Sequence, residues 1–298
     1  MKSLNHSKAL FSSLGFFVYF AGTFSAGAAA LNVSQKPLIL SETVAPNLIL
    51  TLDDSGSMRW AFVPDNINGE FDSRRGKSAD FNPMYYNPNV TYRIPTRYDI
   101  NGNVSSTPYS TSFTQAYNHG FVQSRGNFNL SNSYRVTWSY DPRTTLATNT
   151  AYGYSSTNNR FARNPATDFS ASVVRTTNGT STFTTPAGIV FSITRTGSNS
   201  CTATATMAGV FNNLAANCTR TATNTYQGSL TELAVPAYYY HLDRTLAGCA
   251  NAASNNESCQ KLVFVSSTSG KVRSDDATSG TDERQNFAIW YSFYRNRA

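Results

Sequence analysis

The chain has 298 residues, of which 14% are charged and 13% are aromatic, and its formal net charge is +7 at pH 7. This length allows one large or two ordinary domains, and the composition excludes an intrinsically disordered chain. Lys and Arg are scattered, with the densest cluster at Arg74-Arg75-Gly76-Lys77, and no basic helix or nucleic-acid motif stands out. We therefore predict no nucleic-acid partner. We expect the cluster to be a solvated loop, with weak attraction to an acidic cell surface as the alternative.

The first 30 residues have the pattern of a signal peptide. Lys2 and Lys8 precede an uncharged run over residues 9–30, and small residues at its end offer cleavage after Ala28 or Ala30. The strongly apolar part is roughly a dozen residues long, which is short for an uncleaved membrane anchor. We predict export, with no membrane span after the signal is removed.

An apolar run followed by acid and hydroxyl groups occupies residues 47–58. Residues 48–52 read as a strand buried on both faces, and Asp53, Ser55 and Ser57 then follow at alternate positions. Three hard oxygen ligands at the end of a buried strand predict a Mg²⁺ site, with Mn²⁺ or Ca²⁺ as alternatives. The competing interpretation is a strand-to-turn exit in which Asp53 and Ser55 cap backbone amides.

Residues 59–281 are rich in Asn, Ser, Thr, Tyr, Gly and Pro, and we expect them to form a β-rich, loop-rich region. The strands that we predict there lie at 134–138, 188–195, 202–206, 236–241 and 261–265. In the clearest of them, Ile189, Phe191 and Ile193 alternate with more polar residues. Tyr238, Tyr239 and Tyr240 are expected at alternating sheet positions, with an adhesive aromatic surface as the alternative.

The chain has four cysteines, Cys201, Cys218, Cys249 and Cys259, and no C-x-x-C pair, which makes zinc binding unfavourable. Four cysteines allow three pairings, and local loop closure favours Cys201–Cys218 and Cys249–Cys259. Each bridge is worth roughly 2–3 kcal/mol in the loop-entropy model. Free buried thiols are the alternative, but they are less frequent in exported chains.

Helical periodicity is clear only near the end of the chain. Phe287, Trp290, Tyr291 and Tyr294 recur at the spacing of one helix face. Asp282 is a favourable N-cap, and Gln285 stands three residues later, as in a capping box. Because few partner elements are evident in the sequence, we expect this aromatic face to lack most of its packing surface.

Three blocks of sequence carry a resemblance to a known family. In this order they are residues 46–58, residues 81–92 and residues 282–295, and they follow the signal segment. Together they resemble successive signatures of the PilC/PilY family of type IV pilus biogenesis proteins and tip-associated adhesins. The Asp53-x-Ser55-x-Ser57 loop is also similar to the first metal-binding loop of a von Willebrand factor A-like domain.

The resemblance implies an incomplete α/β von Willebrand A-like domain, present as its first strand and first helix only. A long β-rich insert with two disulfides would interrupt this domain. The implied segments are a signal peptide (1–30), a leader with the first strand and its metal loop (31–58), the insert (59–281) and a truncated first helix (282–298). Asp53, Ser55 and Ser57 would be the first metal ligands, with metal binding weak or absent in the truncated chain.

By the same resemblance, the chain would act in pilus assembly and adhesion in the periplasm, at the outer membrane, at the pilus tip or on the cell surface. Its partners would be pilin or minor pilin subunits, or a host or surface ligand that carries a carboxylate. The alternative is an exported A-domain adhesin that is unrelated to pili and binds its ligand through the insert. We predict no enzymatic activity, because His119 and His241 lie in no catalytic motif.

Overall fold

The computed structural model describes residues 51, 53, 58, 60–63, 73–134, 164–230, 235–270 and 280–295. The chain divides into residues 1–51 and residues 52–298, and the architecture below belongs to the second unit. The signal segment and nearly all of the strand predicted at 48–52 lie outside the described residues, as do residues 135–138 of the strand predicted at 134–138. In the part of the chain that is described, no helix is long and apolar enough to cross a lipid bilayer.

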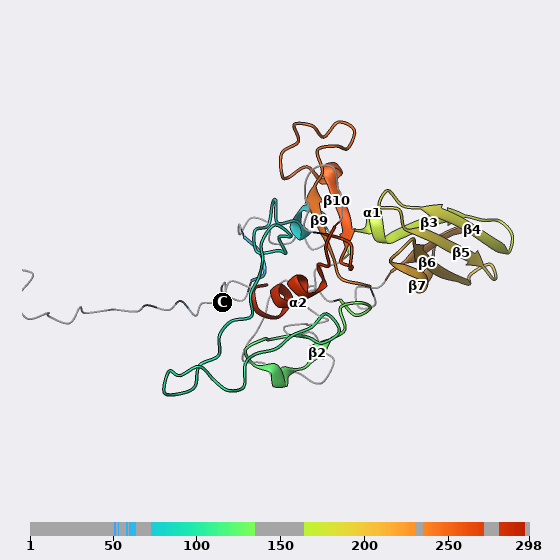
Figure 1. Ribbon diagram of the computed structural model, residues 1–298. Coiled ribbons are helices and arrows are strands. Elements are labelled where there is room, and N and C mark those ends of the chain that lie inside the picture. Colours follow the sequence, from blue (N-terminus) through green and yellow to red (C-terminus); the bar gives the residue numbers. More distant parts are fainter. Residues whose placement is uncertain are drawn as a thin grey trace, which may run out of the picture. The chain divides into compact units, whose positions relative to one another are not determined.

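The described elements are short and mostly strands (Figure 1). In chain order they are η4 (Arg75–Lys77), β1 (Ala116–Tyr117), η5 (Gln123–Arg125), β2 (Asn127–Phe128), α1 (Ala166–Phe169), β3 (Ser170–Val174), β4 (Gly179–Thr184), β5 (Val190–Arg195), β6 (Cys201–Met207), β7 (Phe211–Ala222), β8 (Thr225–Ser229), β9 (Tyr238–Leu242), η6 (Glu257–Cys259), β10 (Gln260–Phe264) and α2 (Arg284–Phe293).

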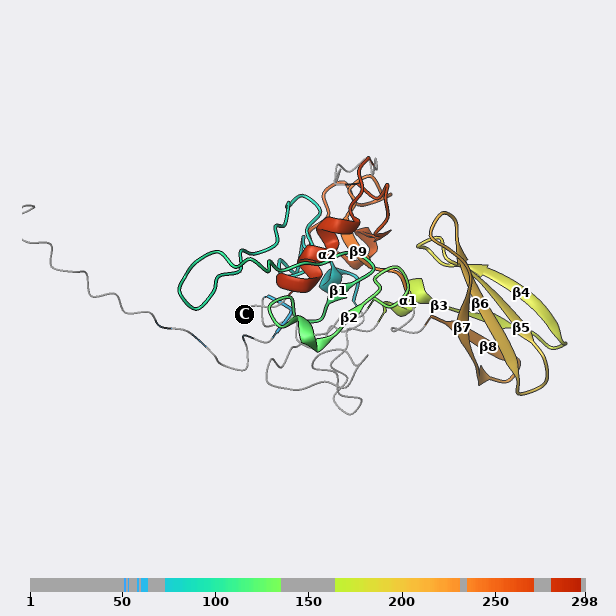
Figure 2. The same ribbon diagram turned by 60° about the horizontal axis from the view of Figure 1, so that its bottom comes forward.

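Six of these strands form one antiparallel sheet, ordered β3-β8-β7-β6-β5-β4 (Figure 2). The alternation read from the sequence of β5 is confirmed, because Phe191 and Ile193 are fully buried and Val190, Ser192 and Thr194 beside them are only partly buried. β8 packs across the interior of this sheet. A Cβ on Gly228 would lie 3.1 Å from both the Ala203 Cβ and the Ile193 Cγ1, so this position requires the smallest residue.

The long strand β7 changes partner along its length. Its first half pairs with β6 as far as Ala216, and its second half pairs with β8 from Asn217 onward. Cys201 and Cys218 form a disulfide two residues beyond the Ala203–Ala216 pair, where β6 and β7 separate. The bridge therefore fixes the point at which β7 separates from β6 and begins to pair with β8.

β9 and β10 form a separate antiparallel hairpin that contains the second disulfide, Cys249–Cys259, in its connection. Both disulfide pairings predicted from the sequence are thus confirmed. Tyr238, Tyr239 and Tyr240 lie in β9, as the expected sheet positions require, and all three are buried, so the alternative of an adhesive surface is wrong for them. Both faces of this strand are covered by other parts of the chain.

The aromatic face of helix α2 is packed, contrary to the expectation that it would lack its packing surface. Phe287, Trp290 and Tyr291 are buried, and only Tyr294 is substantially exposed. The Phe287 ring lies 4.7 Å from that of Tyr86, and the same ring of Tyr86 lies 5.3 Å from Tyr239 of β9. Tyrosines from residues 85–92 and from β9 therefore supply the surface that the helix sequence did not reveal.

The start of α2 only partly follows the predicted capping box. Glu283, not Asp282, is the N-cap residue of α2, although the Asp282 carboxylate accepts a hydrogen bond from the Arg284 amide. The Gln285 side chain, however, donates to the Thr111 carbonyl at 3.1 Å and does not turn back onto the helix. A partner 174 residues away in the sequence thus replaces the local one.

Candidate functional site

The predicted metal loop is only partly described. Asp53 is exposed, whereas Ser55 and Ser57 lie outside the described residues. Among the residues that the structure does describe, no cluster of three or more His, Cys, Asp or Glu side chains could hold a metal ion. The polar sites with described geometry lie elsewhere, around η4, around α2 and at one end of the six-stranded sheet.

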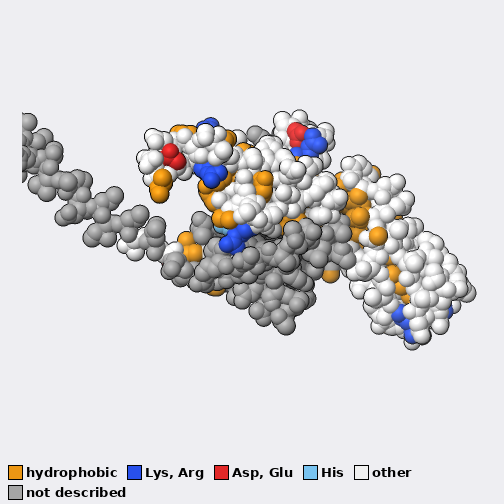
Figure 3. All heavy atoms as spheres, turned by 90° about the horizontal axis from the view of Figure 1, so that it is seen from below, with side chains coloured by type: hydrophobic (Ala, Val, Ile, Leu, Met, Phe, Trp, Pro, Cys, Tyr) orange, Lys and Arg blue, Asp and Glu red, His pale blue; other side chains and the backbone are white. Residues whose placement is uncertain are grey.

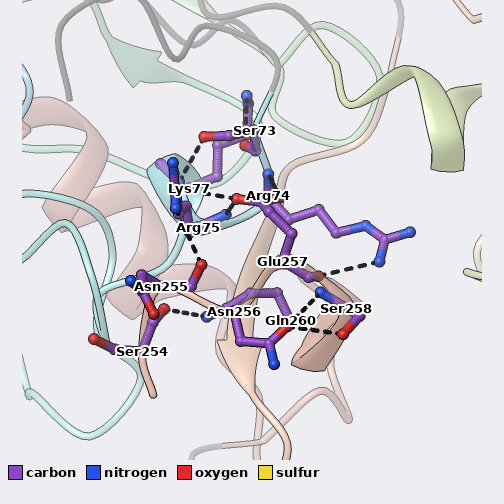
Figure 4. Close-up of polar contacts among 11 residues, drawn as sticks. Ser73, Arg74, Arg75, Lys77, Ser254, Asn255, Asn256, Glu257, Ser258 and Gln260 are labelled. Atoms are coloured by element: carbon purple, nitrogen blue, oxygen red, sulfur yellow. Dashed lines mark hydrogen bonds and ion pairs between the residues drawn. The ribbon is translucent and has the colours of Figure 1, made fainter. Parts of the chain in front are cut away.

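Glu257, from the disulfide-closed loop between β9 and β10, docks on the first turn of η4 (Figure 4). Its carboxylate accepts hydrogen bonds from the backbone amides of Arg74 at 2.7 Å and Arg75 at 3.0 Å. The Arg75 guanidinium adds an ion pair at 3.4 Å and donates to the Asn255 carbonyl. This carboxylate therefore satisfies amides that a short helix leaves without partners, and it ties η4 to the loop.

Asp168 at the end of α1 binds the other side of the same segment. Both of its oxygens accept from the Arg74 guanidinium at 2.7 Å, which is the forked arrangement that suits Arg best. One of these oxygens also accepts from the Tyr240 hydroxyl at 2.6 Å. Burial raises the pKa of Tyr240 well above its usual value, and the Asp168 charge raises it further, so this hydroxyl remains a donor.

The expectation that residues 74–77 form a solvated loop is therefore wrong. Gly76 and Lys77 are buried in η4, and the two arginines are held by Asp168 and Glu257. No local pattern around Arg74 predicts this arrangement, because these carboxylates lie 94 and 183 residues from Arg74.

A second buried carboxylate, Glu283, lies at the start of α2. It accepts from the hydroxyls of Tyr86 at 3.0 Å, Tyr239 at 3.2 Å and Ser269 at 2.8 Å. Asn286, one turn later, donates to the Tyr86 hydroxyl and to the Val90 carbonyl. Burial raises the pKa of Tyr86, and the adjacent Glu283 charge raises it further. The cluster joins the helix to residues 85–92 and to β9.

The far end of α2 is held by a buried arginine. Arg295 lies over the Tyr291 ring at 3.7 Å and donates to the Asn118 carbonyl at 2.6 Å. In the next residue, His119, the Nδ1 accepts from the Val122 amide at 3.1 Å. Burial lowers the pKa of His119, and the charges of Arg125 and Arg295 lower it further, which favours the neutral ring that this hydrogen bond requires.

These three clusters bind one segment of the chain to another. The carboxylates of the first two are occupied by hydroxyls, amides and guanidiniums of the protein itself, so the chemistry they support is structural. Asp282 and Gln285 were predicted to act in this region, but Glu283 was not, because its buried role depends on tyrosines far away in the sequence.

An exposed apolar hairpin tip was also missed. Asp99 accepts from the amides of Asn101 and Asn103, which closes a turn that presents Tyr98, Ile100 and Val104 to solvent. The Asn101-Gly102 pair between apolar residues was the available sequence signal for this turn.

The chain is similar in sequence to three known proteins from Pseudomonas aeruginosa, and each is named type IV pilus biogenesis factor PilY1. The protein of strain UCBPP-PA14 is 50% identical over 117 residues, which are 38% of this chain and 10% of the relative. The protein of strain PAO1 is 46% identical over 133 residues, or 43% of this chain and 11% of the relative. The protein of strain PAK is 46% identical over 115 residues, or 38% of this chain and 10% of the relative.

The matched part of the chain thus spans about a tenth of the length of these curated relatives. No protein-family model matches the chain, and no solved structure matches it. Identity at this level confirms the resemblance to the PilC/PilY family: over its matched part, this chain is similar to three proteins named type IV pilus biogenesis factor PilY1.

Proposed function

We propose that this chain is the N-terminal portion of an exported factor for type IV pilus assembly and adhesion, which acts by metal-assisted binding to other proteins. The observation that carries the proposal is the 46–50% identity to three proteins named type IV pilus biogenesis factor. The two disulfides support export, because such bridges persist in oxidising compartments. The location that fits is the periplasm, the outer membrane, the pilus tip or the cell surface.

In this proposal the fold is a von Willebrand A-like domain with a long insert. Residues 31–58 supply the leader and first strand, residues 282–298 the first helix, and residues 59–281 the insert. The packing of Phe287 against Tyr86 and the hydrogen bond from Tyr239 to Glu283 support a helix that is integrated with the insert.

Asp53, Ser55 and Ser57 are proposed as the first ligands of Mg²⁺, Mn²⁺ or Ca²⁺. A single carboxylate and two hydroxyls suit a hard cation. The exposed position of Asp53 would also leave a bound ion accessible to a partner. The bound ion would supply a coordination position for a carboxylate on a pilin, a minor pilin or a surface ligand.

The role in piliation is tested by deleting the gene in its own host and counting surface pili by electron microscopy. We expect the deletion to remove pili, the full-length gene to restore them and an Asp53→Ala gene to restore fewer. If piliation is unchanged while attachment to surfaces falls, an exported adhesin unrelated to pili replaces the proposal.

The metal assignment is tested on the full-length protein by calorimetric titration with Mn²⁺. We expect Asp53→Ala to weaken binding by at least about tenfold, since it removes the only charged ligand of the three. Asp282→Ala removes another exposed carboxylate and serves as the control. Equal affinity of the Asp53→Ala protein and the wild type would refute the assignment.

A further inference from the structure

The six-stranded sheet carries positive charge and no negative charge. Residues 170–230 contain Arg175, Arg195 and Arg220 but no Lys, Asp or Glu, so three arginines and no acidic residue leave this stretch with a net charge of +3. In the right-hand part of Figure 3, which shows one face of the sheet, blue side chains gather at its end and no red ones are visible. An ordinary surface mixes both signs, so this distribution points to an anionic ligand.

The topology gathers these arginines at one end of the sheet. Alternate strands of an antiparallel sheet end on the same side, and β3, β5 and β7 end there at Val174, Arg195 and Ala222. The turns at this end are residues 175–178, 196–200 and 223–224. We call this region, defined by Arg175, Arg195 and Arg220, the arginine end.

Hydrogen bonds link the arginine end into one surface. Arg195 donates to the Arg175 carbonyl at 2.9 Å and to the Gly197 carbonyl at 3.1 Å. Arg175 donates to the Thr180 carbonyl at 2.6 Å, and Arg220 donates to the Asn199 side chain at 2.7 Å. These acceptors are neutral oxygens, which orient the guanidinium groups without neutralising their charge.

We propose that the arginine end binds an acidic polysaccharide whose sugar units carry carboxylates. Guanidinium forks match carboxylates in geometry as well as charge, and three arginines, in the turn after β3, at the end of β5 and near the end of β7, match a repeating anion. The turns between them contain only Thr, Asn, Ser and Gly besides Arg175, and hydroxyl and amide groups suit sugar hydroxyls. The site is separate from Asp53 and does not rest on the proposed pilus function.

Two other classes of polymer fit less well. Single-stranded nucleic acid is bound through aromatic stacking, but the turns contain no aromatic residue and Tyr226 is fully buried. Protein interfaces depend on large apolar or aromatic anchors, and these turns contain none.

The test is affinity electrophoresis of the full chain in gels that contain polygalacturonate, with EDTA present to exclude metal bridging. We expect retardation at about 20 mM salt that falls at least about tenfold at about 300 mM salt, because exposed charges are screened. Neutral dextran at the same concentration should cause no retardation.

Variants then locate the site. Arg220→Gln should weaken binding about threefold, and Arg175→Gln with Arg220→Gln about tenfold or more, since each removes one charge-assisted contact. Arg244→Gln removes an equally exposed arginine outside the sheet and should change affinity by less than about twofold. If the double variant melts early, Arg220→Gln decides, because the Arg220 guanidinium contacts an exposed turn residue.

Three results would overturn the proposal. They are the absence of retardation by polygalacturonate at low salt, an equal loss of binding in the Arg244→Gln control, and equal retardation by single-stranded DNA of matched charge. The last would reduce the arginine end to a general cationic surface. Because EDTA removes metal, failure here leaves the metal-dependent function proposed for Asp53 unaffected.

Discussion

Asp168 joins three segments of the chain through a single buried carboxylate. It accepts two hydrogen bonds from the Arg74 guanidinium and one from the Tyr240 hydroxyl, so η4, α1 and β9 meet at this group. Taking an ion pair out of water is costly, and this is offset only when the geometry is good and the remaining lone pairs are satisfied, as they are here. Removal of either partner should therefore cost much more than the loss of a surface pair.

We expect Asp168→Asn to reduce the free energy of unfolding by about 3 kcal/mol, because it leaves the partly buried Arg74 charge without its counter-ion. Asp282→Asn is the matched control, since Asp282 pairs with Arg284 in an exposed position and should cost about 1 kcal/mol or less. Urea unfolding followed by tryptophan fluorescence measures both. Equal effects of the two variants would contradict the structural role of Asp168.

His119 gives a prediction for pH. Burial first, and then Arg125 and Arg295, lower the folded-state pKa of His119 below its usual value of about 6.5. At a pH between the folded-state pKa and the unfolded-state pKa of His119, the unfolded chain binds the proton and the folded chain does not. The stability contribution is therefore complete above about pH 6.5 and is lost as the pH falls through the folded-state pKa. Protonation also removes one of the two acceptors of the Val122 amide, which donates to the Nδ1 and to the backbone carbonyl of His119.

The measurement is the urea midpoint between about pH 7.5 and pH 5.5, a window in which His is the side chain that ordinarily titrates. We expect the midpoint to fall with pH in the wild type and to fall less in His119→Asn, which keeps an acceptor for the Val122 amide but does not titrate. Identical pH profiles would show that His119 is not the group responsible. Asp99, Asp243 and Asp282 have pKa values below 3.8 and do not contribute in this window.

At the scale of elements, β7 decides the shape of the six-stranded sheet. One half of this strand belongs to the β6 ladder and the other to the β8 ladder, so the two ladders must diverge near Ala216 and Asn217. The Cys201–Cys218 disulfide lies directly beyond this point. Arg175 and Arg195 add side-chain hydrogen bonds between the end of β3 and strands β4 and β5. Covalent and polar links thus complete a sheet whose backbone ladder is open between β3 and β4.

We expect the Cys201→Ser, Cys218→Ser double variant to unfold with a free energy about 3 kcal/mol lower, as loop closure over 17 residues implies. The Cys249→Ser, Cys259→Ser variant opens a shorter loop, but it also frees Glu257 from the amides of η4. Limited proteolysis should therefore cut near η4 only in the second variant. Cleavage near η4 in the first variant would contradict this assignment of the two bridges.

The molecule as a whole is organised around one aromatic core that crosses long distances in sequence. Tyr86, Tyr134, Tyr239, Phe287 and Trp290 are all buried in it. Phe287 is central, with its ring 4.7 Å from Tyr86, 5.5 Å from Tyr134 and 5.1 Å from Trp290. The helix therefore depends on the region that precedes it, and that region in turn depends on the helix.

We expect Phe287→Ala to lower the free energy of unfolding by about 3–5 kcal/mol, through lost burial and the cavity left behind. Tyr294→Ala at the C-cap of the same helix, where the residue is 38% exposed, should cost clearly less. Urea unfolding of both proteins checks this. A Phe287→Ala effect no larger than that of Tyr294→Ala would show that α2 is not held by this core.

Sequence alone predicted the features that depend on near neighbours. The alternation around Phe191 and Ile193, the two short-range disulfides and the helical face of Phe287, Trp290 and Tyr291 are all confirmed. Each rests on a local period or on loop closure over 10 or 17 residues, which a single chain displays directly. The family resemblance was also local, since it rested on three short blocks.

The tertiary structure alone decided which polar groups are buried and with what. Arg74 is held at the N-terminal end of η4 because Asp168 and Glu257 reach it from 94 and 183 residues away, and Tyr239 is buried where Glu283 accepts its hydrogen bond. A charged or hydroxyl side chain can be buried only when a partner replaces the water that it loses. The identity of that partner is set by the path of the whole chain, so no local pattern around Arg74 or Tyr239 contained it.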